Sequence, residues 1–313
     1  MSVEAVAVHP AVVAVGGGHG LAATLRAMRK YAATITAVVS VADDGGSSGR
    51  LRAEMPDLPA PGDVRRCLSA LADPSLALSD VLEYRFDADA GDLADHAFGN
   101  LLLAALTRTL GSFTDAVDEV ARLCRVEGRV MPATVEPVHL EAMLRASADT
   151  IAARVVGQVA VANARGPRHL GLRPADVASP PGVVDAILDA DQVVVGPGSL
   201  FTSVLAAATV PDVHDALRRT KAQRVYVANL GPEIPETEGF TLDDHLRALR
   251  DHDVPVDVVL CPPGMDHEVT AEGVAVVVRP VADARGLVHA PEPLAAALAG
   301  LLDLGGAPGS GTR

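Results

Sequence analysis

The stretch VVAVGGGHGLAATLRAM, residues 12–28, decides the fold class. Val12–Val15 is a short β-branched run, a glycine turn follows it, and apolar residues then recur at helical spacing from Leu21 to Met28. The stretch predicts a buried strand, a tight loop and a helix. Because a helix N-terminus carries free N–H groups at the positive end of its dipole, the loop is a candidate anion site. Its candidate residues are Gly17, Gly18, His19 and Gly20.

The same alternation of strand and helix continues along the chain. Further strands are predicted at 35–41, 192–195, 224–230, 256–260 and, as a late edge strand, 274–278. Helices are predicted at 64–71, 101–110 and 243–251. This order favours an α/β fold: a Rossmann-like, doubly wound, mostly parallel sheet with helices on both faces.

The middle of the chain is less regular. Residues 135–140 and 155–162 alternate like strands, which predicts a hairpin or small insertion. We therefore predict a single domain over 1–303 with an insertion around 130–190. The Gly-, Pro- and Ser-rich end, 304–313, is predicted to be a disordered tail.

Composition and charge exclude several classes of protein. Hydrophobic residues make up 49% of the 313 residues and charged residues 21%, which excludes a disordered chain. A net charge of −14, aromatics at 3% and the absence of Trp argue against nucleic-acid binding. Residues 1–70 hold seven basic and six acidic residues, so a small phosphate is expected to bind in this part of the chain.

The cysteines and the apolar segments indicate a cytoplasmic protein. Cys67, Cys124 and Cys261 are far apart and form no CxxC, as expected in a reducing compartment. Glu4 and the lack of a basic leader argue against a signal peptide. Residues 192–211 contain no charged residue and are about long enough to span a membrane. The Gly-Pro-Gly-Ser sequence within them instead favours a strand, a turn and a helix N-terminus. No membrane insertion is expected.

The densest candidate site is DDGGSSGR, residues 43–50. The adjacent carboxylates of Asp43 and Asp44, together with Asp63 before a later helix, are candidate ligands for Mg²⁺. The glycines allow backbone N–H groups to converge on an anion, the serines add hydroxyls, and the arginine offers a bidentate fork. The candidate anion-binding residues are Asp44, Gly45, Gly46, Ser47, Ser48, Gly49 and Arg50. Arg50 is expected to matter more to binding than Arg66, which lies one turn into a helix.

Two other interpretations of these loops stay open. Gly18, Gly20 and Ala23 satisfy the dinucleotide pattern G-x-G-x-x-A, with acidic residues about twenty positions on, so NAD is a competing ligand. The 45–49 segment also matches the nucleophile elbow G-x-S-x-G. The neighbouring carboxylates would repel a developing oxyanion, which disfavours a serine hydrolase.

Two further loops follow predicted strands. The first contains Gly196, Pro197, Gly198, Ser199 and Thr202, where a second helix N-terminus would face the first across the crevice. The second holds Asn229, which either reads a base edge or sugar hydroxyl or serves as a turn residue. Among the histidines, His96 is the best candidate to face the site.

Taken together, GGGHGL, VADDGGSSGRLR, APGDVR, HAFGNLLLAAL, VVVGPGSLFTS, VANL and ETEGFTLDDH resemble the YvcK-like gluconeogenesis factors. These are bacterial nucleotide-sugar-binding regulators related to 2-phospho-L-lactate transferase (CofD). The resemblance runs from about Val12 to His267 and implies binding of a UDP-sugar of the UDP-N-acetylglucosamine type. It also implies roles in carbon metabolism, cell-wall precursor supply and cell shape, and it adds Asn100 to the site residues. The chain departs from the family after Leu230 and after Ser203, where contacts to the sugar are expected to differ.

Three hypotheses follow. The leading one is a cytoplasmic nucleotide-sugar-binding regulator without identified catalytic residues, which needs no cofactor and tolerates Mg²⁺. The second is a transferase of a phosphate-linked group, with Mg²⁺ on Asp43, Asp44 or Asp63. The third is an NAD-binding oxidoreductase. A homo-oligomer is compatible with the sequence, and no protein partner is identified by it.

Overall fold

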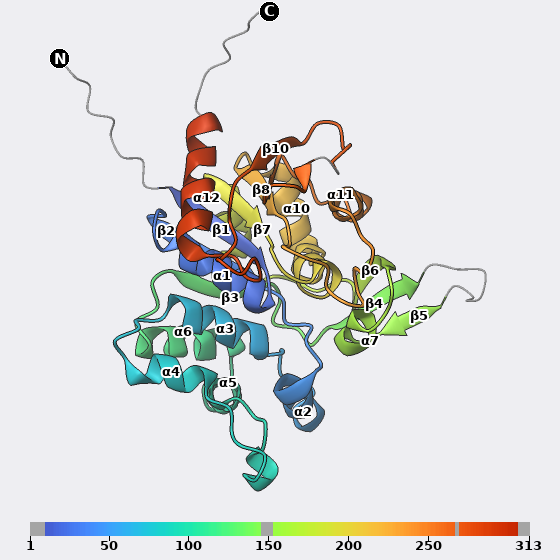
Figure 1. Ribbon diagram of the computed structural model, residues 1–313. Coiled ribbons are helices and arrows are strands. Elements are labelled where there is room, and N and C mark those ends of the chain that lie inside the picture. Colours follow the sequence, from blue (N-terminus) through green and yellow to red (C-terminus); the bar gives the residue numbers. More distant parts are fainter. Residues whose placement is uncertain (1–9, 145–152, 267–268, 306–313) are drawn as a thin grey trace, which may run out of the picture.

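The computed structural model describes residues 10–144, 153–266 and 269–305 (Figure 1). A seven-stranded, wholly parallel sheet lies at its centre, in the order β10-β9-β8-β7-β1-β2-β3. Its strands are β1 (Ala11–Gly16), β2 (Thr34–Val39), β3 (Arg129–Pro132), β7 (Gln192–Val195), β8 (Gln223–Val227), β9 (Val258–Cys261) and β10 (Ala275–Val278). This confirms the α/β prediction, including the edge position of the last strand.

Helices surround the sheet because its strands are apolar on both faces, as parallel strands usually are. All four residues of β7 are buried, and α1 (Gly18–Met28) packs on α3 (Gly62–Leu71) and α12 (Pro291–Gly305). The other helices are α2 (Gly46–Glu54), α4 (Ala77–Glu83), α5 (Phe98–Leu110), α6 (Phe113–Leu123), α8 (Val183–Leu188), α10 (Pro211–Arg219) and α11 (Leu242–Asp251). The shorter helical segments are the 3-10 helix η1 (Gly91–Leu93), the π-helix η2 (Leu200–Leu205) and the α-helix α9 (Ala206–Ala208).

The strand order reverses direction at β1. From β1 the chain runs through β2 to β3 on one side, whereas β7 pairs with the opposite side of β1 and leads on to β8, β9 and β10. In open parallel sheets, ligands bind at the carboxyl ends of the strands at such a switch point. The loops after β1 and β7 are the two glycine loops that the sequence singles out.

A second, three-stranded antiparallel sheet lies within the predicted insertion range (Figure 1). Its order is β5-β4-β6, formed by β4 (His139–Leu144), β5 (Arg154–Val156) and β6 (Pro167–Arg173). The strand predicted at 155–162 is wrong beyond Val156, because Gly157 has a left-handed φ of 106° and helix α7 (Gln158–Ala162) begins after it.

Two other predicted boundaries change. Residues 46–50 belong to α2 rather than to a loop, and this helix needs Gly49, since a Cβ there would lie 2.0 Å from the Asp44 carbonyl oxygen. At the end of the chain, α12 reaches Gly305, and the rest of the predicted tail lies outside the described residues. The uncharged stretch 192–211 is the predicted strand, turn and helical segment. In the described ranges, no helix has both the length and the apolar character needed to span a membrane.

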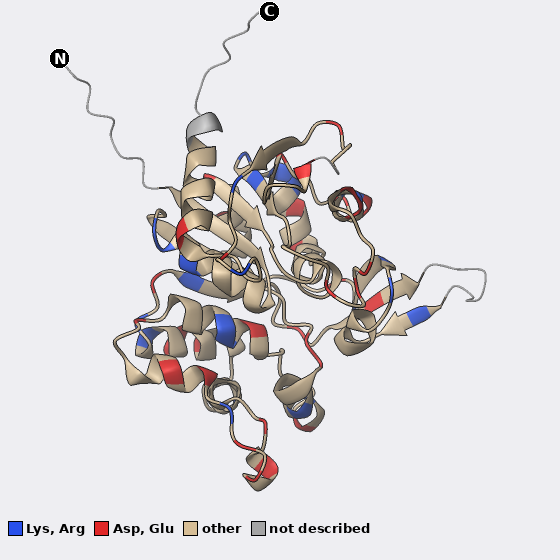
Figure 2. Ribbon diagram, viewed as in Figure 1, with Lys and Arg blue, Asp and Glu red and all other residues tan. Residues whose placement is uncertain are grey.

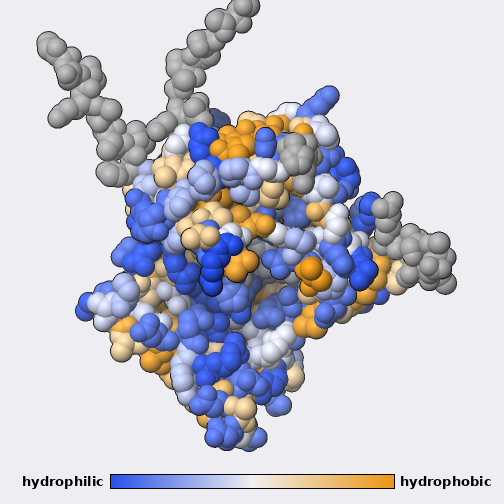
Figure 3. Space-filling view, viewed as in Figure 1, coloured by the Kyte–Doolittle hydropathy of each residue, from blue (hydrophilic) through white to orange (hydrophobic). Residues whose placement is uncertain are grey.

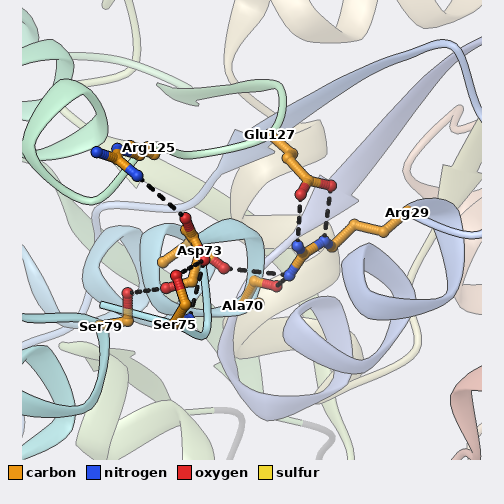
Figure 4. A network of polar contacts seen from close by, with 8 residues as sticks. Arg29, Ala70, Asp73, Ser75, Ser79, Arg125 and Glu127 are labelled. Carbon is orange, nitrogen blue, oxygen red and sulfur yellow. Dashed lines mark hydrogen bonds and ion pairs between the residues drawn. The ribbon is translucent and has the colours of Figure 1, made fainter. Parts of the chain in front are cut away.

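A polar network connects the C-terminal ends of α1 and α3 (Figure 4). The Arg29 guanidinium donates to both carboxylate oxygens of Glu127, at 2.7 and 3.1 Å, and to the carbonyl oxygens of Ala70 and Ala72. Asp73 next to this junction accepts hydrogen bonds from Ser75. The network fixes the two helices relative to each other, and therefore also fixes their opposite ends.

Candidate functional site

A hydrophilic cleft of about 380 Å³ opens at the switch point, and Figure 3 shows this part of the surface hollowed and mostly blue. Its walls are the loop after β1, the start of α2, the start of α3 and the segment after β7, with single residues from α5 and α7. Most of the predicted residues line it. They are Gly17, Gly18, His19, Gly20, Asp43, Gly45, Gly46, Ser47, Ser48, Asp63, Asn100, Gly198, Ser199 and Thr202.

Six predicted residues do not line the cleft: Asp44, Gly49, Arg50, Gly196, Pro197 and Asn229. Six others of its lining residues lie outside the predicted set: Gly62, Arg65, Arg85, Gln158, Ser203 and Glu233. Arg66 also lines the cleft, although the sequence predicts that Arg50 matters more to ligand binding. The Pro-Gly-Asp turn before α3 could have led to Gly62 and the adjacent arginines. No local signal pointed to Gln158 or Glu233, which come from the insertion and from a distant loop.

The two adjacent carboxylates point in different directions. Asp43 faces the cleft, and its Oδ1 accepts from the backbone N–H of Gly45 at 2.9 Å. Asp44 instead accepts from the backbone N–H groups of Gln158 and Val159, both at 2.9 Å, and so caps α7. Side chains at successive positions after a strand alternate in direction, which is why the two carboxylates do not meet.

Three arginines line the cleft, Arg65 and Arg66 from α3 and Arg85 from the segment after α4, and Figure 2 shows basic residues in blue on α3. Arg66 donates to Asp63 Oδ1 at 2.7 Å, and the Gly18 backbone N–H donates to the same carboxylate. Burial raises the pKa of the Asp63 carboxyl and nearby Asp43 raises it further, whereas Arg66 opposes both effects. Arg50 points elsewhere, because its guanidinium donates to the Ala94 carbonyl oxygen at 2.5 Å.

Arg65 and His19 complete this basic side. Arg65 is 2% exposed and pairs with Glu83 at 3.1 Å. Burial lowers the pKa of His19, and the positive charge of Arg66 lowers it further. His19 is therefore a neutral imidazole beside fixed guanidinium charges near neutral pH.

Ser47 forms a buried cluster with His96 and Asn100. Its hydroxyl accepts from the Ala97 N–H at 3.3 Å and from Asn100 Nδ2 at 3.1 Å, and it lies 3.0 Å from His96 Nδ1. A hydroxyl has two acceptor sites and one hydrogen, so this hydrogen is directed to an unprotonated His96 Nδ1. Burial also lowers the pKa of His96. Because both acceptor sites of Ser47 are in use, the arrangement disfavours the nucleophile-elbow interpretation.

The other two polar loops are occupied by the protein's own groups. The Asn229 amide accepts from the Gly198 N–H at 2.8 Å and donates to the Gly198 carbonyl at 3.0 Å, so it supports the turn rather than facing the cleft. Glu236 accepts from the N–H groups of Phe201 and Thr202 at the start of η2. The anion-binding N-terminus predicted after β7 is therefore filled by a carboxylate.

Four buried side-chain polar atoms have no hydrogen-bond partner in the described part of the chain. Three belong to residues that line the cleft, namely Arg65 Nε, Arg66 Nε and Asn100 Oδ1. The fourth is Glu236 Oε2. The other carboxylate oxygen of Glu236 accepts a hydrogen bond from the backbone N–H of Thr202, which lines the cleft. Buried polar atoms are nearly always paired, so these four atoms make the cleft the candidate binding site for polar groups from outside the chain.

The acidic residues offer a limited metal site. Among the described residues, no group of three or more His, Cys, Asp or Glu side chains has an arrangement suited to a metal ion. Asp43 and Asp63 share the cleft, but Asp63 is already engaged by Arg66 and Gly18. The protein's own groups thus supply two carboxylates, and a Mg²⁺ ion there would need oxygen ligands from phosphate and water.

The fold and cleft define a Rossmann-like α/β protein with a polar cleft at its switch point. The profile of the family described as 2-phospho-L-lactate transferase CofD matches residues 12–282, and the chain belongs to that family. A crystal structure of a UPF0052 family member from Bacillus halodurans superposes with a TM-score of 0.84 and 35% identity, covering 92% of this chain and 97% of that one.

Curated relatives agree with this assignment. A protein named "Gluconeogenesis factor" from Halalkalibacterium halodurans is 40% identical over 242 residues, 77% of this chain and 73% of the relative. A relative from Nostoc sp. PCC 7120, named "Putative gluconeogenesis factor", is 44% identical over 241 residues, 77% of this chain. That alignment spans 51% of the Nostoc protein, so the chain matches about half of its length.

Proposed function

We propose that this chain is a gluconeogenesis factor that binds a nucleotide sugar of the UDP-N-acetylglucosamine type in the cleft. Binding would report the supply of this precursor and so regulate carbon metabolism, cell-wall precursor supply and cell shape. The observation that carries the proposal is the set of unpartnered buried polar atoms around one cleft.

The chemistry of those atoms matches such a ligand. Arg65 Nε and Arg66 Nε are charged donors, which phosphate oxygens would satisfy with charge-assisted hydrogen bonds. Asn100 Oδ1 is an acceptor, which a sugar hydroxyl or an acetamido N–H would satisfy. The N-terminus of α2, with Ser47 and Ser48 in its first turn, adds backbone donors for a second phosphate.

Thermal unfolding with a panel of ligands tests the proposal. At a concentration one hundred times Kd, UDP-N-acetylglucosamine should stabilise the fold by about 2.7 kcal/mol. For a chain of 313 residues that raises Tm by roughly 4 °C. Free N-acetylglucosamine, which lacks the phosphates, should not change Tm. A shift with NAD and none with UDP-N-acetylglucosamine would overturn the proposal in favour of an oxidoreductase.

A second candidate, a Mg²⁺-dependent transferase of a phosphate-linked group, is favoured by one observation. Asp43 and Asp63 both line the cleft and interact closely enough for Asp43 to raise the pKa of Asp63. Titration of the nucleotide sugar with and without EDTA separates the candidates. For a binding protein we expect less than a tenfold loss of affinity in EDTA. Binding that disappears with EDTA and returns with Mg²⁺ supports the transferase instead.

A further inference from the structure

A separate cavity of about 250 Å³ lies between the insertion sheet and helix α11 (Figure 1). Its lining comes from the start of β6, from Phe201 in η2, from residues 238–240, and from α11 with the His252 that follows it. It shares no described lining residue with the cleft. This cavity, the β6–α11 pocket, is therefore distinct from the site of the proposed nucleotide sugar.

A β-bulge in β6 turns two successive side chains into the β6–α11 pocket. His169 and Leu170 stand opposite the single residue Ala142 of β4, and His169 has a left-handed φ of 46°. In a regular strand, successive side chains point to opposite faces, so Arg168 and His169 could not both line one cavity. Here they both line it, because the bulge redirects the chain. A left-handed backbone at a residue other than glycine is uncommon, and such positions cluster at functional sites.

His252 holds this bulge in place. Its Nε2 accepts from the backbone N–H of Leu170 at 2.8 Å, and its Nδ1 lies 2.7 Å from the carbonyl oxygen of Ala248, to which it donates. An imidazole that accepts at one nitrogen and donates at the other is neutral. Burial lowers the pKa of His252, which favours this neutral form. The pocket is therefore built by the protein's own contacts, with the His252 ring in its wall.

Aromatic rings make up much of the pocket's apolar wall. The chain has five Phe, and two of them, Phe201 and Phe240, line this pocket. Phe201 makes edge-to-face contacts with Phe240 and with His252, and in both pairs the ring centroids are 6.2 Å apart. Rings in this arrangement favour a flat apolar group as their partner.

Two lining side chains of opposite charge have no partner in the described part of the chain. They are Arg168 and Asp251, whose side chains form no hydrogen bond or ion pair there. The other charged lining residues are paired, as Arg247 is with Asp244 and Glu238 is with an arginine outside the pocket. One guanidinium and one carboxylate thus remain available to a ligand at the same cavity.

We propose that the β6–α11 pocket binds a free aromatic amino acid. The ring of the ligand packs against the aromatic wall, its carboxylate pairs with Arg168, and its ammonium group pairs with Asp251. An aromatic ligand with a single charge would satisfy one of these side chains and be repelled by the other, whereas a zwitterion satisfies both. The inference does not rest on the proposed function, because the pocket and the cleft are separate.

Calorimetric titration of the wild-type chain tests the proposal with L-phenylalanine as the probe. Three relatives of the probe each lack one feature: 3-phenylpropanoate lacks the ammonium group, L-phenylalaninamide lacks the carboxylate, and L-alanine lacks the ring. We expect L-phenylalanine to bind and each relative to bind at least about tenfold more weakly, since each has lost one of the three contacts. If L-phenylalanine does not bind, or L-alanine binds equally well, the proposal is overturned.

Two variants assign the charged contacts. Arg168→Gln should remove the preference for L-phenylalanine over L-phenylalaninamide, and Asp251→Asn should remove the preference over 3-phenylpropanoate. The controls are Arg250→Gln, on the same helix but at a different cavity, and Asp118→Asn, at an exposed position of α6. Each control should leave every affinity within about twofold of the wild type.

All four substituted positions are exposed, so the variants should keep the wild-type circular dichroism spectrum. Ligand preferences in Arg168→Gln and Asp251→Asn that equal those of the wild type would show that the amino acid binds elsewhere, and would refute the proposal.

Discussion

Glu236 makes the stability of this protein depend on pH in a predictable direction. It is 2% exposed, its Oε1 accepts from Thr202 and Phe201 at 2.8 and 3.1 Å, and its Oε2 has no partner. Burial raises the pKa of its carboxyl from an ordinary 4.5 to about 7. At pH values between 4.5 and about 7, Glu236 is protonated in the folded state and ionised in the unfolded state. The free energy of unfolding therefore falls as pH rises through this window.

The size of the effect follows from the shift. A difference of 7 minus 4.5 is about 2.5 pKa units, and each unit is worth about 1.4 kcal/mol, so the loss above pH 7 is roughly 3 kcal/mol. Glu236→Gln keeps the oxygen that accepts from Phe201 and Thr202 but cannot ionise. We expect the difference in unfolding free energy, variant minus wild type, to increase by about 2.5 kcal/mol from pH 5 to pH 8, because part of the loss has already occurred at pH 5.

Urea denaturation at the two pH values measures this difference. Glu238→Gln is the control, because Glu238 is 42% exposed in its side chain and its ion pair with Arg165 lies at the surface. Surface pairs contribute little to stability, so this control should change by under about 1 kcal/mol at either pH. If the unfolding free energies of Glu236→Gln and the wild type differ by the same amount at pH 5 and pH 8, burial does not raise the pKa of the Glu236 carboxyl and the reasoning is refuted.

Two further predictions concern the cleft. Arg66→Ala should weaken nucleotide-sugar binding by roughly 1.5–3 kcal/mol, the cost of a lost hydrogen bond to a charged group, while Arg50→Ala should leave the Kd within twofold. Calorimetry measures both, and equal losses would mean that the phosphates lie elsewhere. Asp44→Asn should reduce affinity only through the position of Gln158, with the circular dichroism spectrum unchanged. The double variant with Gln158→Ala should then lose no more than Gln158→Ala alone, and losses that add would show that Asp44 contacts the ligand itself.

The sequence by itself determined the architecture and the position of the loops. Strand and helix periodicity, the glycines after Val15 and Val195, and the Pro-Gly-Asp turn before α3 are local signals, and the structure confirms the parallel sheet that they predict. Such signals are local because backbone conformation depends mainly on a residue and its near neighbours. The order of the strands, and hence the switch point, needed the fold itself.

Only the tertiary structure decided which polar groups meet in the cleft. Asp43 and Asp44 are neighbours in sequence, yet only Asp43 faces it, because α7 arrives from the insertion and takes the other carboxylate. Arg66 lines the cleft and Arg50 does not, since side-chain direction depends on the phase of each helix. Glu236 closes a helix N-terminus that looked open in the sequence. These outcomes depend on segments that are far apart in the chain and come together only when it folds.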